Sequence, residues 1–204
     1  MTRRLIIGID AANLRSGGGV THIVELLSAA ELVNHGIIKV IIWGGKSMLD
    51  KLPEHAWLDK ISPPELNRGL LARTIWQRFK LGRVACDAQC SVLFVPGGSY
   101  AGSFRPIVTL SQNLLPFDWR ELRRFGLSWL TLKYVILRFV QANTFRRADG
   151  LIFLTCYAKE TVMRIIKGTA GKTTIVPHGI DDRFVNPPRE QLPIHCYSVD
   201  RPFR

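Results

Sequence analysis

The sequence lacks a long apolar segment. A helix that crosses a bilayer needs about 18 or more consecutive apolar residues, and the nearest candidate, residues 129–140, is interrupted by Lys133 and Arg138. The N-terminal Met-Thr-Arg-Arg leads into an apolar stretch, residues 5–9, that is too short for the core of a secretory signal peptide. We therefore expect a cytoplasmic protein that does not span a membrane.

Cysteine pairs of the kind that hold metals are also lacking. The chain has 4 cysteines, and no two of them form a Cys-x-x-Cys pair. A zinc site would have to combine Cys86, Cys90, His195 and Cys196, whose spacing matches no usual pattern. We therefore predict reduced thiols and no bound metal.

Acidic residues are scarce relative to basic ones. The chain has 28 Lys and Arg against 16 Asp and Glu, a formal net charge of +12. Such a charge suits an anionic partner, whether nucleic acid, a membrane surface or a phosphorylated ligand. No recognisable DNA- or RNA-binding motif accompanies it, so we do not expect nucleic acid to be the partner.

Apolar, strand-like segments alternate with helical segments along the chain. The apolar segments show no alternation of apolar and polar residues, which indicates a sheet covered on both faces. We predict an α/β fold with a doubly wound, mostly parallel, Rossmann-like sheet. The expected strands are residues 5–9, 37–43, 92–95, 107–110, 151–154 and 174–176, and the expected helices are residues 20–33, 68–84, 119–147 (with a break near Gly126) and 157–167. We place one domain at residues 1–184, followed by a proline-rich linker at residues 185–204 that leads towards a second domain.

Three glycines, Gly17, Gly18 and Gly19, lie between the first strand and the first helix. Glycines let the backbone approach a ligand, and a helix N-terminus offers unpaired N–H groups and partial positive charge. The loop lacks the G-x-G-x-x-G order, and glycines stand where an acidic residue would follow the second strand, so a nicotinamide or flavin cofactor is disfavoured. We predict a site for a phosphorylated ligand. A tight turn without a ligand and a stand-alone nucleotide-binding protein are the alternatives.

Two other patterns imitate catalytic motifs and fail. Residues 168–173 contain a Gly-Lys-Thr run, but the spacing of the glycines is wrong for a P-loop and a strand follows instead of a helix. No serine lies in a G-x-S-x-G setting, so hydrolase chemistry is not expected.

Polar residues follow the strand predicted at residues 107–110. Gln112, Asn113 and Asp118 come after its carboxyl end, where open α/β sheets bind their ligands. Two amides and a carboxylate can form hydrogen bonds with sugar hydroxyls. The alternative is that these side chains only cap the end of the strand.

The segment from residue 120 to residue 147 is basic and rich in aromatic residues. It has seven basic residues against one acidic residue, Glu121. A basic helix with tryptophan and phenylalanine on its apolar side can lie on an anionic bilayer. The alternative is a core helix with a solvated cationic face. The residues predicted to face a membrane are Arg120, Arg123, Arg124, Lys133 and Arg138.

Four segments, taken in order, resemble the N-terminal domain of the family 4 glycosyltransferases of the GT-B fold. They are residues 17–22, 108–116, 147–155 and 176–181. The last of them, Val-Pro-His-Gly-Ile-Asp, is similar to the family's V-P-N/H-G-I-D signature. The resemblance covers nearly the whole chain but only about half of a typical member.

The resemblance implies a retaining, metal-independent transferase that uses a nucleotide-sugar donor, with no other cofactor, in cell-surface polysaccharide or lipopolysaccharide assembly. Gly17, Gly18 and Gly19 would contact the donor diphosphate, and Gln112, Asn113 and Asp118 would face a glycan or lipid-linked acceptor. Gln112 stands where many members carry histidine, and glutamine cannot titrate. The nucleotide pocket and the main catalytic residues would lie in a second domain, so we expect the 204 residues to be inactive alone.

The alternative is a non-catalytic remnant that binds a ligand or the inner face of a membrane.

Overall fold

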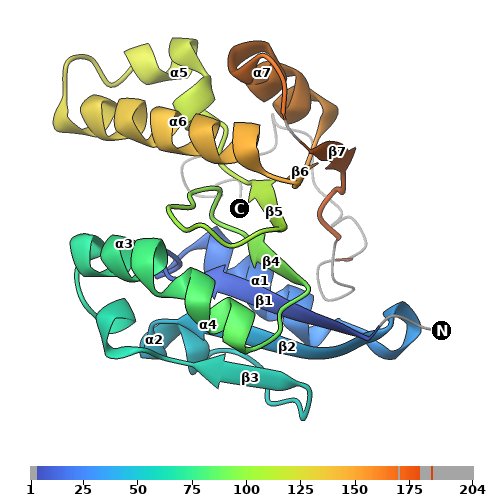
Figure 1. Cartoon of the computed structure of the whole chain (residues 1–204). Coiled ribbons are helices and arrows are strands. Elements are labelled where there is room, and N and C mark those ends of the chain that lie inside the picture. The colour runs from blue at the N-terminus through green and yellow to red at the C-terminus, as the bar shows by residue number, and fades with distance from the viewer. Residues whose placement is uncertain (1–3, 170, 180–184, 186–204) are drawn as a thin grey trace, which may run out of the picture.

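The structure is a computed structural model that describes residues 4–169, 171–179 and 185. Its strands form one parallel sheet in the order β3-β2-β1-β4-β5-β6-β7 (Figure 1). The strands are β1 (Leu5–Ala11), β2 (Ile37–Gly44), β3 (Leu58–Ile61), β4 (Val92–Val95), β5 (Ile107–Ser111), β6 (Gly150–Phe153) and β7 (Lys172–Ile175). Every neighbouring pair is parallel, which confirms the predicted α/β fold.

Helices connect the strands. The α-helices are α1 (Gly18–Ser28), α2 (Lys46–Leu49), α3 (Leu70–Phe79), α4 (Leu81–Asp87), α5 (Trp119–Arg123), α6 (Trp129–Arg147) and α7 (Cys156–Ile166). Short 3₁₀ turns lie at η1 (Val33–His35), η2 (Pro64–Asn67) and η3 (Leu115–Phe117). None of the helices in the described part of the chain is both long enough and apolar enough to cross a bilayer.

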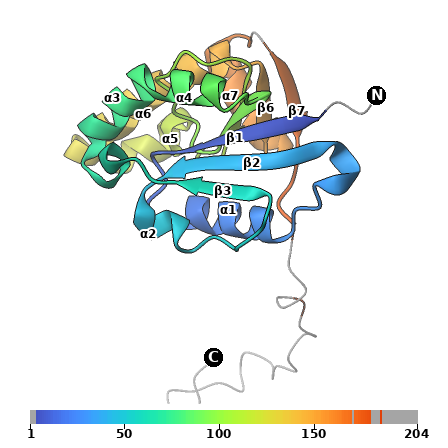
Figure 2. The same ribbon diagram turned by 60° about the horizontal axis from the view of Figure 1, so that its bottom comes forward.

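Apolar side chains cover both faces of the sheet. On one face, α1 and α2 pack against β1, β2 and β3 around Ile23 and Ile42. On the other face, α3 and α4 pack around Trp43 and Leu81, and α6 and α7 pack on β6 around Phe153. Figure 2 shows α1 and α2 on one side of the sheet and α3 and α4 on the other. The sheet is therefore doubly wound, as the uninterrupted apolar strands indicated.

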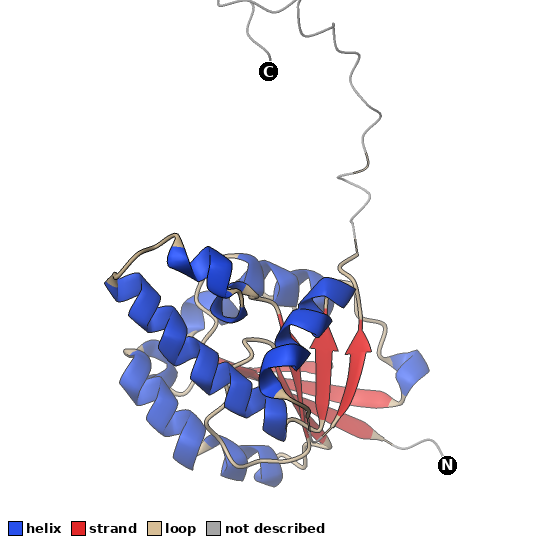
Figure 3. Ribbon diagram, turned by 90° about the horizontal axis from the view of Figure 1, so that it is seen from above, coloured by secondary structure: helices blue, strands red, loops and turns tan. Residues whose placement is uncertain are grey.

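Because neighbouring strands are parallel, their carboxyl ends lie at one edge of the sheet. β2 and β3 lie on one side of β1, and β4 to β7 lie on the other, so the direction of winding reverses between β1 and β4. Such a reversal opens a crevice at the carboxyl ends of the two strands, where open α/β sheets bind ligands. The sheet is strongly twisted: Figure 3 shows strands at its two ends running in clearly different directions.

Several predicted elements differ from the structure. The helix expected at residues 68–84 is two helices, α3 and α4, and the one expected at residues 20–33 ends at Ser28. The long helix at residues 119–147 is broken where expected: Gly126 has a φ of 58°, which glycine adopts readily, and Ser128 then caps α6. β3 was not predicted. The predicted linker at residues 185–204 lies outside the described residues, apart from Val185, as do His195 and Cys196.

Candidate functional site

The glycine loop lies at the carboxyl edge of the sheet and begins α1. Gly17 is the N-cap, with φ 76° and ψ −164°, a backbone conformation that is essentially restricted to glycine. The Gly17 carbonyl accepts hydrogen bonds from the N–H groups of Val20 (3.0 Å) and Thr21 (3.3 Å). The first N–H groups of a helix have no intrahelical partner, so this turn offers donors and partial positive charge to an anion.

Gln112 lies beside the glycine loop. A Cβ added to Gly19 would stand 3.4 Å from Gln112 Oε1 and 3.1 Å from Leu14 Cδ2. The Nε2 of Gln112 and the Oγ of Ser111 are buried and have no hydrogen-bond partner among the described residues. Buried polar atoms are rarely left unpaired. The fold thus brings together two segments that are distant in the sequence and leaves a buried amide donor between them without a partner among the described residues.

Asn113 and Asp118 have local partners instead. Asn113 is exposed, and its Oδ1 accepts a hydrogen bond from the Leu115 N–H at 3.0 Å. Asp118 is the N-cap of α5, and its Oδ1 accepts from the N–H groups of Arg120 and Glu121 at 3.0 and 3.2 Å. Both side chains therefore take part in local turn and helix geometry, and their contact with an acceptor stays a prediction. The Asp-x-x-Glu pattern at residues 118–121 is the sequence signal for such a cap.

Two histidines meet next to the same loop. The rings of His22, in α1, and His178, which follows β7, are 4.9 Å apart in an edge-to-face arrangement. Burial lowers the pKa of His22, and the charge of His178 lowers it further. His22 is therefore predominantly neutral at neutral pH, where it can form hydrogen bonds but carries no positive charge. Both histidines lie in segments that carried the resemblance, yet nothing in the sequence indicated that they touch.

A buried carboxylate lies beneath this edge. Asp10, in β1, is 4% exposed. Its Oδ1 accepts from the Ala12 N–H at 3.1 Å, and its Oδ2 accepts from Gln77 Nε2, while Gln77 Oε1 accepts from the Ala101 N–H at 2.9 Å. Burial raises the pKa of Asp10 to about 6, and the hydrogen bonds from Gln77 and Ala12 oppose that rise. A raised pKa can mark a functional group, but this carboxylate is enclosed and fully engaged, so we assign it the role of bracing β1 to α3 and the loop at residues 96–106.

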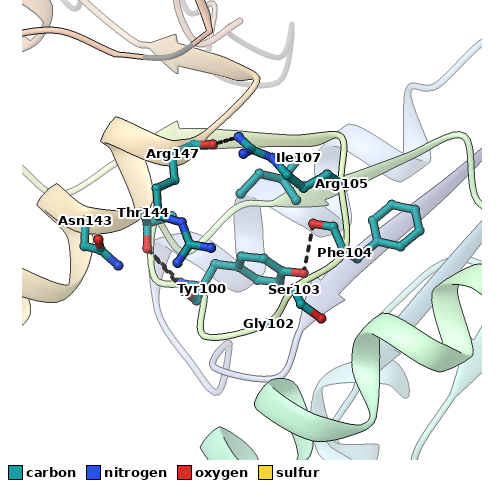
Figure 4. Close-up of a pocket in the computed structure, with 9 residues that line it drawn as sticks. All are labelled: Tyr100, Gly102, Ser103, Phe104, Arg105, Ile107, Asn143, Thr144 and Arg147. Carbon is teal, nitrogen blue, oxygen red and sulfur yellow. Dashed lines mark hydrogen bonds between the residues drawn. The ribbon is translucent and has the colours of Figure 1, made fainter.

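A small pocket lies at the other end of β5 (Figure 4). It encloses about 10 Å³, room for about one water molecule and too little for a sugar. Beside it, Asp149 Oδ2 accepts from the Ile107 N–H at 2.8 Å and from Arg105 Nε at 3.1 Å. The third segment of the resemblance, residues 147–155, therefore contributes a structural contact here. The lining residues are Tyr100, Gly102, Ser103, Phe104, Arg105, Ile107, Asn143, Thr144 and Arg147.

The outward side of α6 is apolar and exposed. Trp129 is 79% exposed. Further exposed apolar residues follow it at intervals of three or four positions, so they lie on the same face of the helix. The opposite side is buried through Ala142 and Phe145. We name this outward face the α6 apolar stripe; it consists of Trp129, Leu132, Ile136 and Phe139.

The predicted membrane-facing basic residues divide into two groups. Arg120, Arg123, Arg124 and Lys133 are exposed on α5, on the turn after it and on α6. Arg138 lies on the inward side of α6, where it is half-buried, and its Nη1 donates to the Pro116 carbonyl at 3.5 Å. Four of the five residues are therefore exposed and Arg138 is partly buried; that they face a membrane stays a prediction.

Comparison with known proteins adds no family name. A scan against models of known protein families gave no match, and a search of curated proteins gave none. The described residues contain no group of three or more His, Cys, Asp or Glu side chains that could hold a metal ion.

Proposed function

We propose that this chain is the acceptor-binding N-terminal domain of a retaining, metal-independent glycosyltransferase of the GT-B class. It would act in cell-surface polysaccharide or lipopolysaccharide assembly, with a nucleotide-sugar donor and a glycan or lipid-linked acceptor. The observation that supports this most is the meeting of three of the four resembling segments at one edge of the sheet. Gly19 lies against Gln112, and His22 lies against His178.

The proposed chemistry is positioning and charge stabilisation. The N–H groups at the start of α1 would stabilise the negative charge that develops on the leaving diphosphate. The free amide of Gln112 would orient the acceptor hydroxyl towards the anomeric carbon of the donor. Gln112 cannot take up a proton, so this domain supplies orientation rather than a general base at that position. The nucleotide itself would be bound by a second domain.

Nucleoside diphosphate release tests the proposal. The chain is assayed alone and together with a GT-B nucleotide-sugar-binding domain, using several common sugar nucleotides and a pool of lipid-linked acceptors. We expect release only from the combination, and only in the presence of the acceptor. If no donor is turned over by any combination, the proposal fails. Tight binding of NAD by the chain in equilibrium dialysis would favour the stand-alone nucleotide-binding protein instead.

A second candidate function is peripheral binding to an anionic membrane, and the exposed α6 apolar stripe favours it. A helix that carries tryptophan and phenylalanine outwards, with basic residues nearby, can enter the interface of a bilayer. Leu127, in the turn before α6, is fully exposed, which extends the apolar surface. Arg120, Arg123 and Arg124 lie on the same part of the chain. The two functions are compatible, because lipid-linked acceptors are embedded in membranes.

We expect the chain to sediment with vesicles that contain anionic lipid and to be released by salt. A basic residue near an anionic surface contributes about 1 kcal/mol, so Arg123→Glu combined with Arg124→Glu should weaken binding at least tenfold, by about 1.4 kcal/mol or more. Lys51→Glu combined with Arg83→Glu changes the net charge equally at exposed sites away from α5 and α6 and should have a smaller effect. Equal losses from both pairs, or binding that ignores salt, would contradict this function.

A further inference from the structure

Two arginines lie close to each other on the α3 side of the glycine loop. Arg15 lies between β1 and the loop, and Arg73 lies in the first half of α3. Arg15 Nη2 donates to the Arg68 carbonyl at 2.5 Å, in the turn that precedes α3, and Arg73 Nη1 donates back to the Ala12 carbonyl at 3.1 Å, just after β1. The two side chains thus cross between the same two segments. Burial lowers the pKa of Arg73, and the positive charge of Arg15 lowers it further.

Neither of these two arginines forms an ion pair within the described part of the chain. The carboxylates there that form ion pairs do so with other basic residues, and neither Arg15 nor Arg73 has one within 4.0 Å. The Nε of Arg73 is buried and lacks a hydrogen-bond partner among the described residues, as does Oδ1 of the neighbouring Asn13. An anion bound between the two arginines would offset the repulsion between their positive charges and would accept a hydrogen bond from a donor that has no partner.

The geometry of the donors favours phosphate. A guanidinium group offers five N–H donors in a planar fork that matches the oxygens of a phosphate. Each of these two side chains donates one hydrogen bond to a backbone carbonyl, which leaves most of its donors free. Asn13 Oδ1 can accept a hydrogen bond from a hydroxyl on the same ligand. The combination suits a phosphate ester that carries a hydroxyl group.

The helix that carries Arg73 begins with two exposed apolar side chains. Leu70 and Leu71, in the first turn of α3, are 64% and 74% exposed. A ligand with a phosphate on Arg73 could therefore place an apolar chain along the start of the same helix. Figures 1 and 2 show α3 on the side of the molecule where β1 and β2 end, next to the turn that leads into α1.

We propose that Arg15 and Arg73 bind the phosphate of the acceptor, a phosphate ester that is either lipid-linked or soluble. The assignment of this phosphate to the acceptor rests on the function proposed above. The phosphate site itself rests only on the two arginines. It differs from the diphosphate seat at the start of α1, which lies against Gln112, whereas Arg15 and Arg73 bridge the segment after β1 and the start of α3.

Phosphate binding by the 204-residue chain tests the proposal without a sugar donor. The probes are sn-glycerol 3-phosphate, measured by calorimetry, and phosphatidylcholine vesicles with or without phosphatidic acid. We expect Arg15→Gln and Arg73→Gln each to weaken binding of the preferred probe about tenfold, because each removes a charge-assisted contact. Binding of glycerol 3-phosphate identifies a headgroup site that needs no lipid, and binding of phosphatidic acid vesicles alone identifies a lipid phosphate.

Arg78→Gln is the matched control. Arg78 also lies in α3, and its removal costs the same charge, but its guanidinium lies over the ring of Phe79 at 5.7 Å. It should bind phosphate as the unsubstituted chain does. Arg73 also contacts Ala12, so the binding result for Arg73→Gln counts only if the thermal unfolding of this variant is unchanged. If its unfolding changes, Arg15→Gln, at an exposed position, provides the test.

Two results would overturn the phosphate site: failure of the unsubstituted chain to bind either probe, or equal binding by Arg15→Gln, Arg78→Gln and the unsubstituted chain. Neither result would bear on nucleoside diphosphate release, which is measured separately. Conversely, if phosphate binding depends on the two arginines but no sugar transfer is found, the phosphate site is supported and the proposed transferase function is contradicted.

Discussion

Gln77→Met is expected to destabilise the fold by about 2 to 4 kcal/mol near pH 7.5 and by clearly less near pH 4.5. Gln77 Nε2 donates to the buried carboxylate of Asp10, and its Oε1 accepts from the Ala101 N–H. Methionine has a similar shape but offers neither group. At pH 7.5 the substitution therefore leaves the buried charge of Asp10 with only the Ala12 N–H as a donor and leaves the Ala101 N–H without its partner.

The pH dependence follows from the pKa of Asp10, which burial raises from 3.8 to about 6. Because the folded pKa lies above the unfolded one, the contribution of this group to stability is fully present below about pH 4 and is lost as the pH rises through about 6. A shift of about two units corresponds to about 3 kcal/mol at neutral pH. Gln77→Met removes a hydrogen bond that lowers the pKa of Asp10. The loss of stability with rising pH therefore becomes larger and extends to higher pH.

Urea unfolding of both chains at several pH values between about 4.5 and 7.5 measures this difference. Gln141→Met is the control: Gln141 is also buried in a helix, but its Nε2 has only a long contact of 3.4 Å, to the Gly97 carbonyl, and no carboxylate. It should change stability by a similar amount at every pH. A pH-independent loss in Gln77→Met would show that the charge of Asp10 is not the cause.

The main strands of the sheet could be predicted because their local sequence and their environment agree. β2, with six Ile, Val or Trp residues among its eight positions, is apolar because helices cover both of its faces. β3 lacks that signal: its four residues are Leu-Asp-Lys-Ile, it lies at the edge of the sheet, and Asp59 forms an ion pair with Lys39 at 2.6 Å. A short, half-polar edge strand looks like a loop until its neighbour is known.

Only the parts of the candidate site that directly follow predicted strands could be predicted from the sequence. The glycine loop and Gln112 were found because both follow apolar strands, whose carboxyl ends meet at one edge. The contact between His22 and His178 and the proximity of Arg15 to Arg73 depend on segments far apart in the chain. No spacing within the sequence encodes such contacts, so they emerged only from the fold.

Gly18→Ala is expected to leave the fold intact and to slow sugar transfer by the combined domains about 100-fold. Gly18 is the first residue of α1, and an added Cβ would meet nothing within 4 Å, so alanine should be neutral or stabilise the helix by up to about 1 kcal/mol. The open space above it is where the proposed diphosphate would approach the backbone. A methyl group there keeps the phosphate from the N–H donors. Thermal unfolding and nucleoside diphosphate release measure the two effects.

Neighbouring glycines separate ligand binding from backbone strain. Gly17→Ala forces alanine into a conformation with φ 76° and ψ −164°, so it should cost about 1 to 3 kcal/mol of stability in addition to activity. Gly69→Ala is the control, because Gly69 caps α3 with a φ of −64° and has open space around it, and it should change neither quantity. If Gly18→Ala transfers sugar at the unsubstituted rate, the loop is a turn rather than a phosphate seat. If Gly18→Ala loses sugar transfer while Gly69→Ala, which is also expected to be stable, retains it, the start of α1 is where the diphosphate binds.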